Sequence, residues 1–331
     1  MPPLKIHLDT DFGGDIDDLC ALALLLGWPD VEITGITTVA EHAGKRAGFV
    51  RYVLWLAGED GVPVAAGADA RSGRYRQPPG LPSEEHYWPE AVAAAPGPEE
   101  AAIDLLKHSL DLGATLIAIG PFTNLALLEA RHPGTLNQAK LCLMGGSVRA
   151  APDGFPAWGS DMDYNVQADP IAATQVLESS HPTLVPIEAT VQTALRRSHL
   201  PALERSAPLG PLIAHQAKAF DADERNSERY RQTCSKLPDD IVNFQHDPLA
   251  CSVALGWDGV TLETVALVLD LGEDGLLRMR ADPHGHAYLV ASGVDGERFN
   301  QLWLDVVTNS RRWSEIASVR GTSDDSGFIH R

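Results

Sequence analysis

Short apolar runs alternate with longer segments of helical periodicity along the first 190 residues of the chain. Runs rich in β-branched residues are typical of strands, and apolar residues three and four positions apart are typical of helices. This alternation favours an α/β fold with a mostly parallel, doubly wound sheet and helices on both faces. The predicted strands are 4–8, 31–39, 62–67, 114–120, 139–146 and 183–190. The predicted helices are 17–27, 46–58, 99–113, 123–132 and 169–179.

The pattern becomes less regular after residue 200. Residues 200–235 indicate helix with polar interruptions, and another helix is expected over 247–256. Residues 261–292 have the alternation of an antiparallel meander, and 296–313 that of an amphipathic helix.

No linker divides the sequence, so we expect one domain over residues 1–331. Two irregular stretches, 71–98 and 221–236, are candidates for lids over a site. Their aromatic residues, such as Trp88 and Tyr230, would either stack on a flat ligand or pack within the loops.

Charge narrows the choice of partners. Lys and Arg number 26 against 45 Asp and Glu, a formal net charge of −19. Such an acidic protein is a poor partner for nucleic acid or an anionic membrane, but suits a metal ion or a small neutral ligand. No apolar run reaches the ~18 residues of a membrane span, and the first residues lack the apolar stretch of a signal peptide. We therefore expect a cytoplasmic protein.

The cysteine and tryptophan positions predict core residues rather than a site. No cysteine pair has zinc-binding spacing. Cys20, Cys142 and Cys251 lie in apolar stretches and are expected to be buried thiols. Trp55 and Trp303 lie in apolar helical patterns and are also expected in the core.

The stretch DTDFGGDIDD places five carboxylates within ten residues, from Asp9 to Asp18. It follows the first predicted strand, and ligands of parallel α/β sheets bind beyond the carboxyl ends of the strands. Converging carboxylates suit a hard cation such as Ca²⁺, which takes about six to eight oxygen ligands. Gly13 and Gly14 would allow the chain to turn between the carboxylates.

Other interpretations of this stretch explain less. An EF-hand loop fails because Gly13 and Cys20 stand where oxygen ligands are required. A phosphatase of the haloacid-dehalogenase kind would use Asp9 and Asp11, but Gly13 occupies its Thr or Val position. Helix capping would explain single aspartates but not all five.

A second motif, HDP, places His246 and Asp247 before a predicted helix. A helix cap with proline in the first turn is the simpler explanation of this motif alone. However, Asp247 offers a further oxygen ligand, and His246 offers a group that titrates near neutral pH.

Seven blocks of sequence occur in a fixed order from about Lys5 to the last predicted helix. They are DTDFGGDIDDLCAL (9–22), GITTVA (35–40), VPVAAGA (62–68), GPFTNLAL (120–127), LMGG (143–146), DYN…DP (163–170) and HDPLA (246–250). Together they resemble the inosine–uridine-type nucleoside hydrolases, with two extra residues before the last aspartate pair. The resemblance implies a modified doubly wound fold, one bound Ca²⁺ and a homodimer or homotetramer that releases free base and ribose from ribonucleosides.

The resemblance also implies roles for particular residues. It assigns the Ca²⁺ to Asp11, Asp18, the backbone oxygen of Thr123, and Asp247. It makes Asp11 the general base that acts on a metal-bound water, and His246 the group that protonates the leaving base.

For the sugar, the resemblance implies contacts from Asp17, Asp163 and Asn165. Asp163 stands where the family usually has Glu. The sequence departs from the family at two places. His42 stands where the family usually has an Asn that reaches the sugar. It either replaces that hydrogen bond to the sugar or is an exposed loop residue. A further Asn, near the ribose 5′-hydroxyl in the family, is absent between 147 and 162, where Trp158 lies.

The leading hypothesis is therefore a Ca²⁺-dependent nucleoside N-ribohydrolase. The alternatives are an enzyme with the same metal site acting on a modified riboside or another N-glycoside, the phosphatase above, and a non-catalytic relative that binds a riboside.

Overall fold

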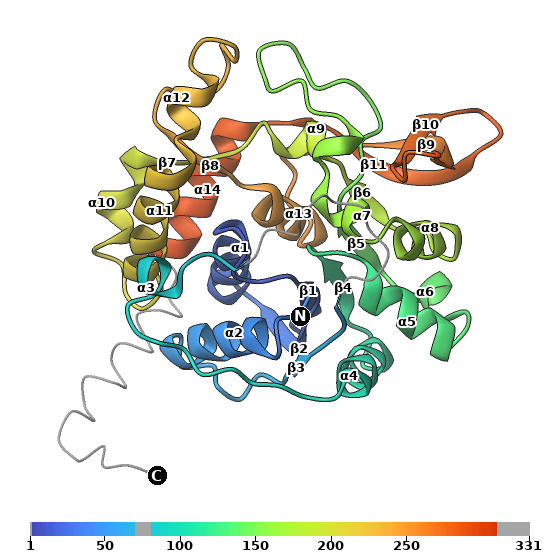
Figure 1. The fold of residues 1–331 in the computed structure, drawn as a ribbon, viewed down its shortest axis with the longest axis horizontal. Helices are drawn as coiled ribbons and strands as arrows, with labels where there is room; N and C mark the ends of the chain where they lie inside the picture. The colour runs from blue at the N-terminus through green and yellow to red at the C-terminus, as the bar shows by residue number, and fades with distance from the viewer. Residues whose placement is uncertain (1, 70–80, 310–331) are drawn as a thin grey trace.

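The computed structural model describes residues 2–69 and 81–309, and its centre is a nine-stranded sheet (Figure 1). The strands of this sheet are β1 (Leu4–Thr10), β2 (Val31–Thr38), β3 (Val64–Ala66), β4 (Thr115–Ala118), β5 (Leu141–Met144), β6 (Thr183–Val185), β9 (Val260–Leu271), β10 (Leu277–Ala281) and β11 (His286–Val294). They lie in the order β10-β9-β11-β6-β5-β4-β1-β2-β3. The neighbours from β3 to β6 pair in parallel, which confirms the predicted fold class.

Helices connect the strands and lie on both faces of the sheet, as the sequence predicted (Figure 1). Their bounds are α1 (Asp17–Gly27), α2 (Lys45–Leu56), α3 (Glu84–Tyr87), α4 (Glu99–Asp111), α5 (Thr123–Arg131), α6 (Thr135–Gln138), α7 (Tyr164–Ala168), α8 (Pro170–Glu178), α9 (Ile187–Thr190), α10 (Leu200–Leu203), α11 (Gly210–Glu224), α12 (Asn226–Tyr230), α13 (His246–Ala254) and α14 (Gly296–Asn309). Two short 3₁₀ helices are η1 (Ser160–Met162) and η2 (Arg197–His199).

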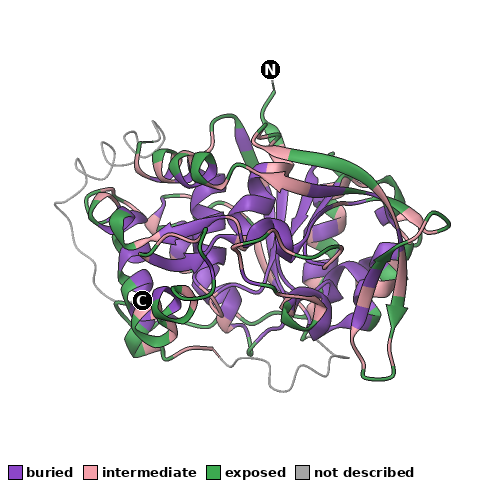
Figure 2. Cartoon of the chain, turned by 90° about the horizontal axis from the view of Figure 1, so that it is seen from above, coloured by how far each residue is buried: buried purple, intermediate pink, exposed green. Residues whose placement is uncertain are grey.

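Two large hydrophobic clusters lie against opposite faces of the sheet. Neighbouring residues of β4 show the division, because side chains alternate along a strand. Ile117 belongs to the cluster that includes α1, α2 and α13, whereas Leu116 belongs to the cluster that includes α4, α5 and α8. Figure 2 shows the buried residues concentrated along the sheet and the helices packed on it.

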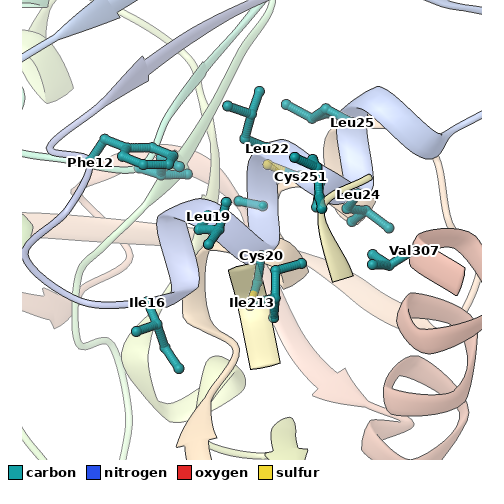
Figure 3. Close-up of a cluster of buried hydrophobic side chains, with 14 of the residues drawn as sticks. Phe12, Ile16, Leu19, Cys20, Leu22, Leu24, Leu25, Ile213, Cys251 and Val307 are labelled. Carbon is teal, nitrogen blue, oxygen red and sulfur yellow. The ribbon is translucent and has the colours of Figure 1, made fainter. Parts of the chain in front are cut away.

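Helix α1 is enclosed along its whole length. All of its residues are buried, and its leucines meet Ile213, Cys251 and Val307 from the second half of the chain (Figure 3). The Nε1–H of Trp303 in α14 donates a hydrogen bond to the backbone oxygen of Cys20 at 3.0 Å. The predicted burial of Cys20, Cys142, Cys251 and Trp303 is therefore confirmed.

The prediction that Trp55 lies in the core is wrong. Trp55 is 49% exposed near the end of α2, whereas Val53 and Leu54 face the hydrophobic cluster. Apolar residues occur on more than one side of α2, so the sequence pattern does not identify the buried side.

The strand predicted over 183–190 is shorter than expected. It ends at Val185, and Ile187–Thr190 form the helix α9 instead. Pro186 between them has no N–H to donate to a neighbouring strand, and its fixed φ is compatible with the start of a helix.

The three C-terminal strands are antiparallel as predicted, but they are not a meander. β9 lies between β10 and β11, and β11 joins the parallel sheet by pairing with β6. Because β11 uses one edge for β6, only its other edge is available to β9.

The order β3-β2-β1-β4-β5-β6 reverses the direction of chain progression between β1 and β4. Such a switch point leaves a crevice beyond the carboxyl ends of the two strands, where ligands of doubly wound proteins bind. The acidic stretch after β1 therefore begins at this crevice.

A separate two-stranded antiparallel sheet, β7 (Ala194–Arg196) with β8 (Ile241–Phe244), leads into α13 and carries His246 and Asp247 to the same region. Among the residues that the structure describes, no helix is both long enough and apolar enough to span a membrane.

Candidate active site

A cavity of about 430 Å³ opens beyond the carboxyl ends of β1, β4 and β5. The residues directly after these strands, Asp11 and Ile119, and the last residue of β5, Met144, contribute to its wall. Most residues predicted for the site line this one cavity. They are Asp11, Asp17, Asp18, Asp163, Asn165, His246 and Asp247.

Three carboxylates converge at one end of the cavity. Carboxylate oxygens of Asp17, Asp18 and Asp247 all lie within 4.8 Å of one another. The first two lie in the first turn of α1, and the third in the first turn of α13, because these helices pack side by side. Asp17 also accepts a hydrogen bond from the backbone N–H of Asp247 at 3.3 Å, and Thr10 donates one to Asp18.

Burial and mutual repulsion raise the pKa values of this cluster. Each of Asp17, Asp18 and Asp247 has a pKa well above its usual range, first because of burial and then because of the neighbouring carboxylates. Burial likewise raises the pKa of Asp11, although the Arg46 guanidinium opposes that shift. None of these three buried carboxylates forms an ion pair with a residue in 2–69 or 81–309. Such a cluster is costly unless a cation joins it, so this donor set fits a hard divalent metal.

Asp11 lies beside the cluster and not within it. Its carboxylate faces Gly120, where an added Cβ would come within 2.9 Å of Asp11 Oδ1 and 2.8 Å of its backbone nitrogen. Gly120 therefore leaves room for the Asp11 side chain. The resemblance implies that Asp11 binds the ion with Asp18 and Asp247. In the structure, the third member of the carboxylate cluster is Asp17.

Asp163 and Asn165 are positioned by helix α7. Asp163 is its N-cap, accepting hydrogen bonds from the backbone N–H groups of Val166 and Gly146, and burial raises the pKa of this carboxyl to about 6. Asn165 Nδ2 donates to the backbone oxygens of Ile119 and Met144 at 3.0 and 3.2 Å. These bonds fix the amide and leave its Oδ1 as an acceptor for a ligand in the cavity.

His246 is fixed by α9. Its Nδ1 lies 2.6 Å from Thr190 Oγ1, and burial lowers the pKa of the imidazole to about 4. The ring is therefore neutral at neutral pH. The one hydroxyl hydrogen of Thr190 can go to Nδ1 or to the backbone oxygen of Ile187, 3.1 Å from Oγ1. When it goes to Nδ1, the hydrogen of the neutral ring is on Nε2 and available to a ligand.

Aromatic side chains form another part of the cavity wall. The ring of Trp158 lies 5.0 Å from Phe244 and 6.0 Å from both Tyr230 and His246, measured between centroids. All four residues line the cavity. The arrangement joins a wall that suits a flat heterocycle to an acidic end that suits a metal and a sugar.

Two predicted residues do not line the cavity. His42 is exposed in the loop after β2. The neighbouring Glu41 points inward, where it accepts hydrogen bonds from the backbone N–H of Gly44 and Ala47. Thr123 is buried at the start of α5, and its Oγ1 donates to Asp169 Oδ2 at 2.7 Å.

The two lid candidates differ. Residues 70–80 lie outside the described residues, and the remainder of 71–98 contributes nothing to the cavity wall. There Trp88 stacks on Phe49 at 4.2 Å between ring centroids, so it packs within the protein. In 221–236, by contrast, α12 places Tyr230 against the cavity.

Sequence reasoning missed several lining residues. The most notable is Arg46, a buried cation beside the acidic stretch; the others include Asn243 and Glu224. One feature of the sequence indicated Arg46: it is the first residue of a largely apolar predicted helix that follows the second predicted strand. For Asn243 and Glu224 nothing in the local pattern distinguishes them from ordinary polar residues.

The doubly wound fold and its acidic cavity belong to a hydrolase that acts on N-glycosyl compounds, as comparison with known proteins shows. The family model of the inosine-uridine preferring nucleoside hydrolases matches residues 6–301. The chain therefore belongs to this family of enzymes, which hydrolyse the N-glycosidic bond of ribonucleosides. Membership leaves the phosphatase interpretation without support.

Relatives and solved structures agree with this assignment. The chain is 30% identical over 292 residues to the inosine-uridine preferring nucleoside hydrolase of Leishmania major, covering 83% of this chain and 85% of that protein. It is 30% identical over 235 residues to the pyrimidine-specific ribonucleoside hydrolase RihA of Klebsiella pneumoniae, covering 66% and 70%. The structure of the plant nucleoside hydrolase PpNRh1 superposes with a TM-score of 0.75 over 93% of this chain and all of that one, at 22% identity, which shows the shared fold.

Proposed function

We propose that the protein is a Ca²⁺-dependent nucleoside N-ribohydrolase in which Asp11 is the general base. The observation that carries the proposal is the buried cluster of Asp17, Asp18 and Asp247, with Asp11 beside it in the same cavity as Asn165.

Asp18 and Asp247 would hold the ion, and the oxygens of Asp11 and the Thr123 backbone are the further ligands that the family resemblance supports. Hard oxygen donors and the absence of Cys or His from the cluster favour Ca²⁺ over a softer metal. A bound divalent cation would lower the pKa of a water molecule and fix sugar hydroxyls.

In the reaction, the water oxygen bonds to the anomeric carbon of the sugar, and the bond from that carbon to the base nitrogen breaks. Asp11 takes a proton from the water. The electron pair of the broken bond leaves with the base, so positive charge develops on the sugar ring. The surrounding carboxylates stabilise that charge because they are buried and already in place.

His246 would assist the departure of the base. Because burial lowers its pKa to about 4, a neutral ring whose Nε2–H donates to the leaving base fits the structure better than an imidazolium. Asp17 and the free Oδ1 of Asn165 would bind sugar hydroxyls, and Asp163 would face the sugar beside them.

The base would lie against the aromatic wall, where Trp158 and Tyr230 offer ring surfaces. Trp158 belongs to the segment where the family has an asparagine near the 5′-hydroxyl. This observation supports the second candidate, a modified riboside or another N-glycoside. The family resemblance further supports a homodimer or homotetramer, which the mass of the protein in solution tests. The free, buried cysteines are compatible with the cytoplasmic location that the sequence predicts.

The test measures release of reducing sugar and free base from a panel of ribonucleosides and other N-glycosides, with Ca²⁺ or with EGTA. We expect release that EGTA abolishes, and a fall in kcat of about 10² to 10⁴-fold for Asp11→Asn. The exposed His42→Asn variant is the matched control and should retain activity. Undiminished turnover by Asp11→Asn would refute the role of Asp11, and undiminished turnover in EGTA would refute the role of the ion.

A further inference from the structure

Arg46 is a charged side chain enclosed within the protein. It lies in the first turn of α2, is 1% exposed, and is among the largest fully buried side chains. Its Nε donates to the backbone oxygen of Ala40 at 2.8 Å, and its Nη1 to those of Phe12, at 3.1 Å, and Asp11. Nε and Nη1 therefore hold together the backbone segments that follow β2 and β1.

The remaining amino group is unpaired. Nη2 of Arg46 donates no hydrogen bond to any residue that the structure describes. Unlike the side-chain atoms of Gln245, which are inaccessible and also unbonded, Nη2 keeps a small accessible surface. Because Arg46 lines the cavity and is otherwise enclosed, the accessible part of Nη2 faces the cavity. A buried N–H group without a partner is costly, so a ligand atom is expected there.

Gly14 packs on the guanidinium. An added Cβ at Gly14 would lie 3.4 Å from Arg46 Nη1 and 3.8 Å from Nη2, which is ordinary van der Waals contact, and both residues line the cavity. The acidic stretch and the arginine therefore meet at one place in the cavity wall. His42, in the loop after β2, is exposed and does not line the cavity.

The charges around Arg46 restrict its ligand. In the described ranges 2–69 and 81–309 the guanidinium forms no ion pair. It is nevertheless close enough to Asp11 and Asp18 to oppose the rise that burial causes in their pKa values. An anionic ligand group at Nη2 would be repelled by these carboxylates. A neutral acceptor oxygen, such as a hydroxyl of a sugar bound at the carboxylates, meets the requirement.

We propose that Arg46 is a sugar-binding residue whose Nη2 donates a hydrogen bond to one hydroxyl oxygen of the substrate sugar, while Nε holds the segment after β2 and Nη1 the loop after β1. The proposal rests on the proposed function in that it takes the ligand to be a riboside. It assigns to Arg46 the sugar contact considered for His42.

The test combines a protein substitution with removal of single hydroxyls from the ligand. A purine C-nucleoside, whose carbon–carbon link to the sugar cannot be hydrolysed in this way, and its 2′-, 3′- and 5′-deoxy forms are titrated calorimetrically in saturating Ca²⁺. The proteins are wild type, Arg46→Lys and Arg46→Met, with Arg51→Lys as matched control because Arg51 is exposed on the same helix. Kinetics on the matching N-nucleosides and the melting temperature of each protein accompany the titrations.

We expect Arg46→Lys to weaken binding of the C-ribonucleoside by roughly 10- to 100-fold, because lysine keeps the charge but not the three-edged geometry. On one deoxy form that loss should shrink to about two-fold, since its partner hydroxyl is already missing. An equal loss on all four ligands would overturn the proposal, because it would show that Arg46 only holds the loop.

Gly14→Leu provides a second variant in case the arginine variants do not fold. A Cβ at Gly14 would lie in ordinary contact with the guanidinium, so the longer leucine side chain must displace the guanidinium or the hydroxyl in front of it. Its loss of binding should show the same dependence on one hydroxyl. If the wild-type protein binds C-nucleosides but cleaves no N-nucleoside, the proposed function is refuted. The dependence of binding on single hydroxyls then still tests the role of Arg46. A wild-type protein that neither binds nor cleaves ribosides would overturn both.

Discussion

The aspartates of the cavity have the same side chain but different surroundings. Asp17, Asp18 and Asp247 face one another, and the pKa of each is raised first by burial and then by nearby carboxylates. Asp163 instead accepts backbone hydrogen bonds at the start of α7. The first three therefore need a cation to remain ionised together, whereas Asp163 is stabilised by the chain itself.

Thr190 provides a test of how His246 is oriented. Replacing Thr190 with Val removes the hydroxyl that lies 2.6 Å from His246 Nδ1 and frees the tautomer of the ring. We expect kcat/KM for ribonucleosides to fall about 5- to 10-fold, the value of one hydrogen bond. The measurement compares nucleosides with 4-nitrophenyl riboside, whose leaving group needs no assistance and whose turnover should change less than two-fold.

Thr193→Val is the matched control for this experiment. Thr193 Oγ1 donates to the backbone oxygens of Thr190 and Gln245 and does not touch His246. Equal losses by both substrates in Thr190→Val would contradict an effect on the leaving base.

At the residue scale, the sequence identified the carboxylates of the site but not the buried arginine beside them, Arg46. The spacing of Asp11, Asp17 and Asp18 after a strand is a local pattern, so it is visible in one dimension. The burial of Arg46 depends on the segments after β1 and β2, whose backbone oxygens accept its hydrogen bonds. No short stretch of sequence therefore shows that Arg46 is buried.

Three secondary-structure elements meet at His7, beneath the site. Its Nδ1 lies 2.8 Å from Ser109 Oγ in α4, and its Nε2 lies 3.0 Å from Thr37 Oγ1 in β2. Thr37 in turn donates to Asp9 Oδ1 at 2.5 Å, so its oxygen accepts the hydrogen of Nε2. His7 therefore connects β1, β2 and α4 as a neutral ring.

Stability should decrease in acid because of His7. Burial lowers its folded-state pKa to about 3, while the unfolded chain takes up the proton near the usual value of about 6.5. Between these values the unfolded state binds more protons, so the free energy of unfolding falls as pH falls, by at most about 1.4 kcal/mol per pH unit. Urea unfolding in EGTA at several pH values should show a shallower slope for His7→Gln than for wild type.

His108→Gln is the control for this slope. His108 is on α4 beside Ser109 but is exposed, so its replacement should leave the pH dependence as in wild type. A His7→Gln protein with the wild-type slope would contradict the assigned neutral state.

Element predictions succeeded where local patterning decides the outcome. Helix α1 matches its predicted range, as does the start of α5. The position of β9 between β10 and β11 depends instead on β11 pairing with β6, a contact between distant segments. The shortened β6 had a local signal in Pro186, which ends a strand.

The whole molecule should respond to removal of the ion. Cation binding relieves repulsion among the buried carboxylates and adds about 2.7 kcal/mol of stability at a Ca²⁺ concentration 100 times Kd. We expect EGTA to lower the melting temperature by roughly 5 °C. Differential scanning calorimetry with and without Ca²⁺ measures the difference.

Two substitutions make this measurement specific. Asp247→Asn should melt at a higher temperature than wild type in EGTA, because one buried charge is removed, and should lose most of the Ca²⁺ response. Asp163→Asn keeps the three-carboxylate cluster and should retain that response. A full Ca²⁺ response in Asp247→Asn would place the ion elsewhere.

At the scale of the molecule, the alternation of strands and helices was sufficient to predict a doubly wound sheet and the edge at which the site lies. It did not predict the separate sheet of β7 and β8, whose strands are three and four residues long. Such short strands have no periodicity to detect, and they form because α13 and its flanking loops bring them together.

The contact between Asp17 and the backbone of Asp247 joins residues 230 positions apart. A ribosome adding about 5 to 20 residues per second needs roughly 10 to 50 seconds to synthesise the intervening chain. During that interval the nascent protein has its first acidic helix without the partner that completes the ion site. Under the proposed function, capture of the ion would therefore mark the time at which the N-terminal and C-terminal parts of the fold have met, and a truncated product that lacks Asp247 could not complete the site.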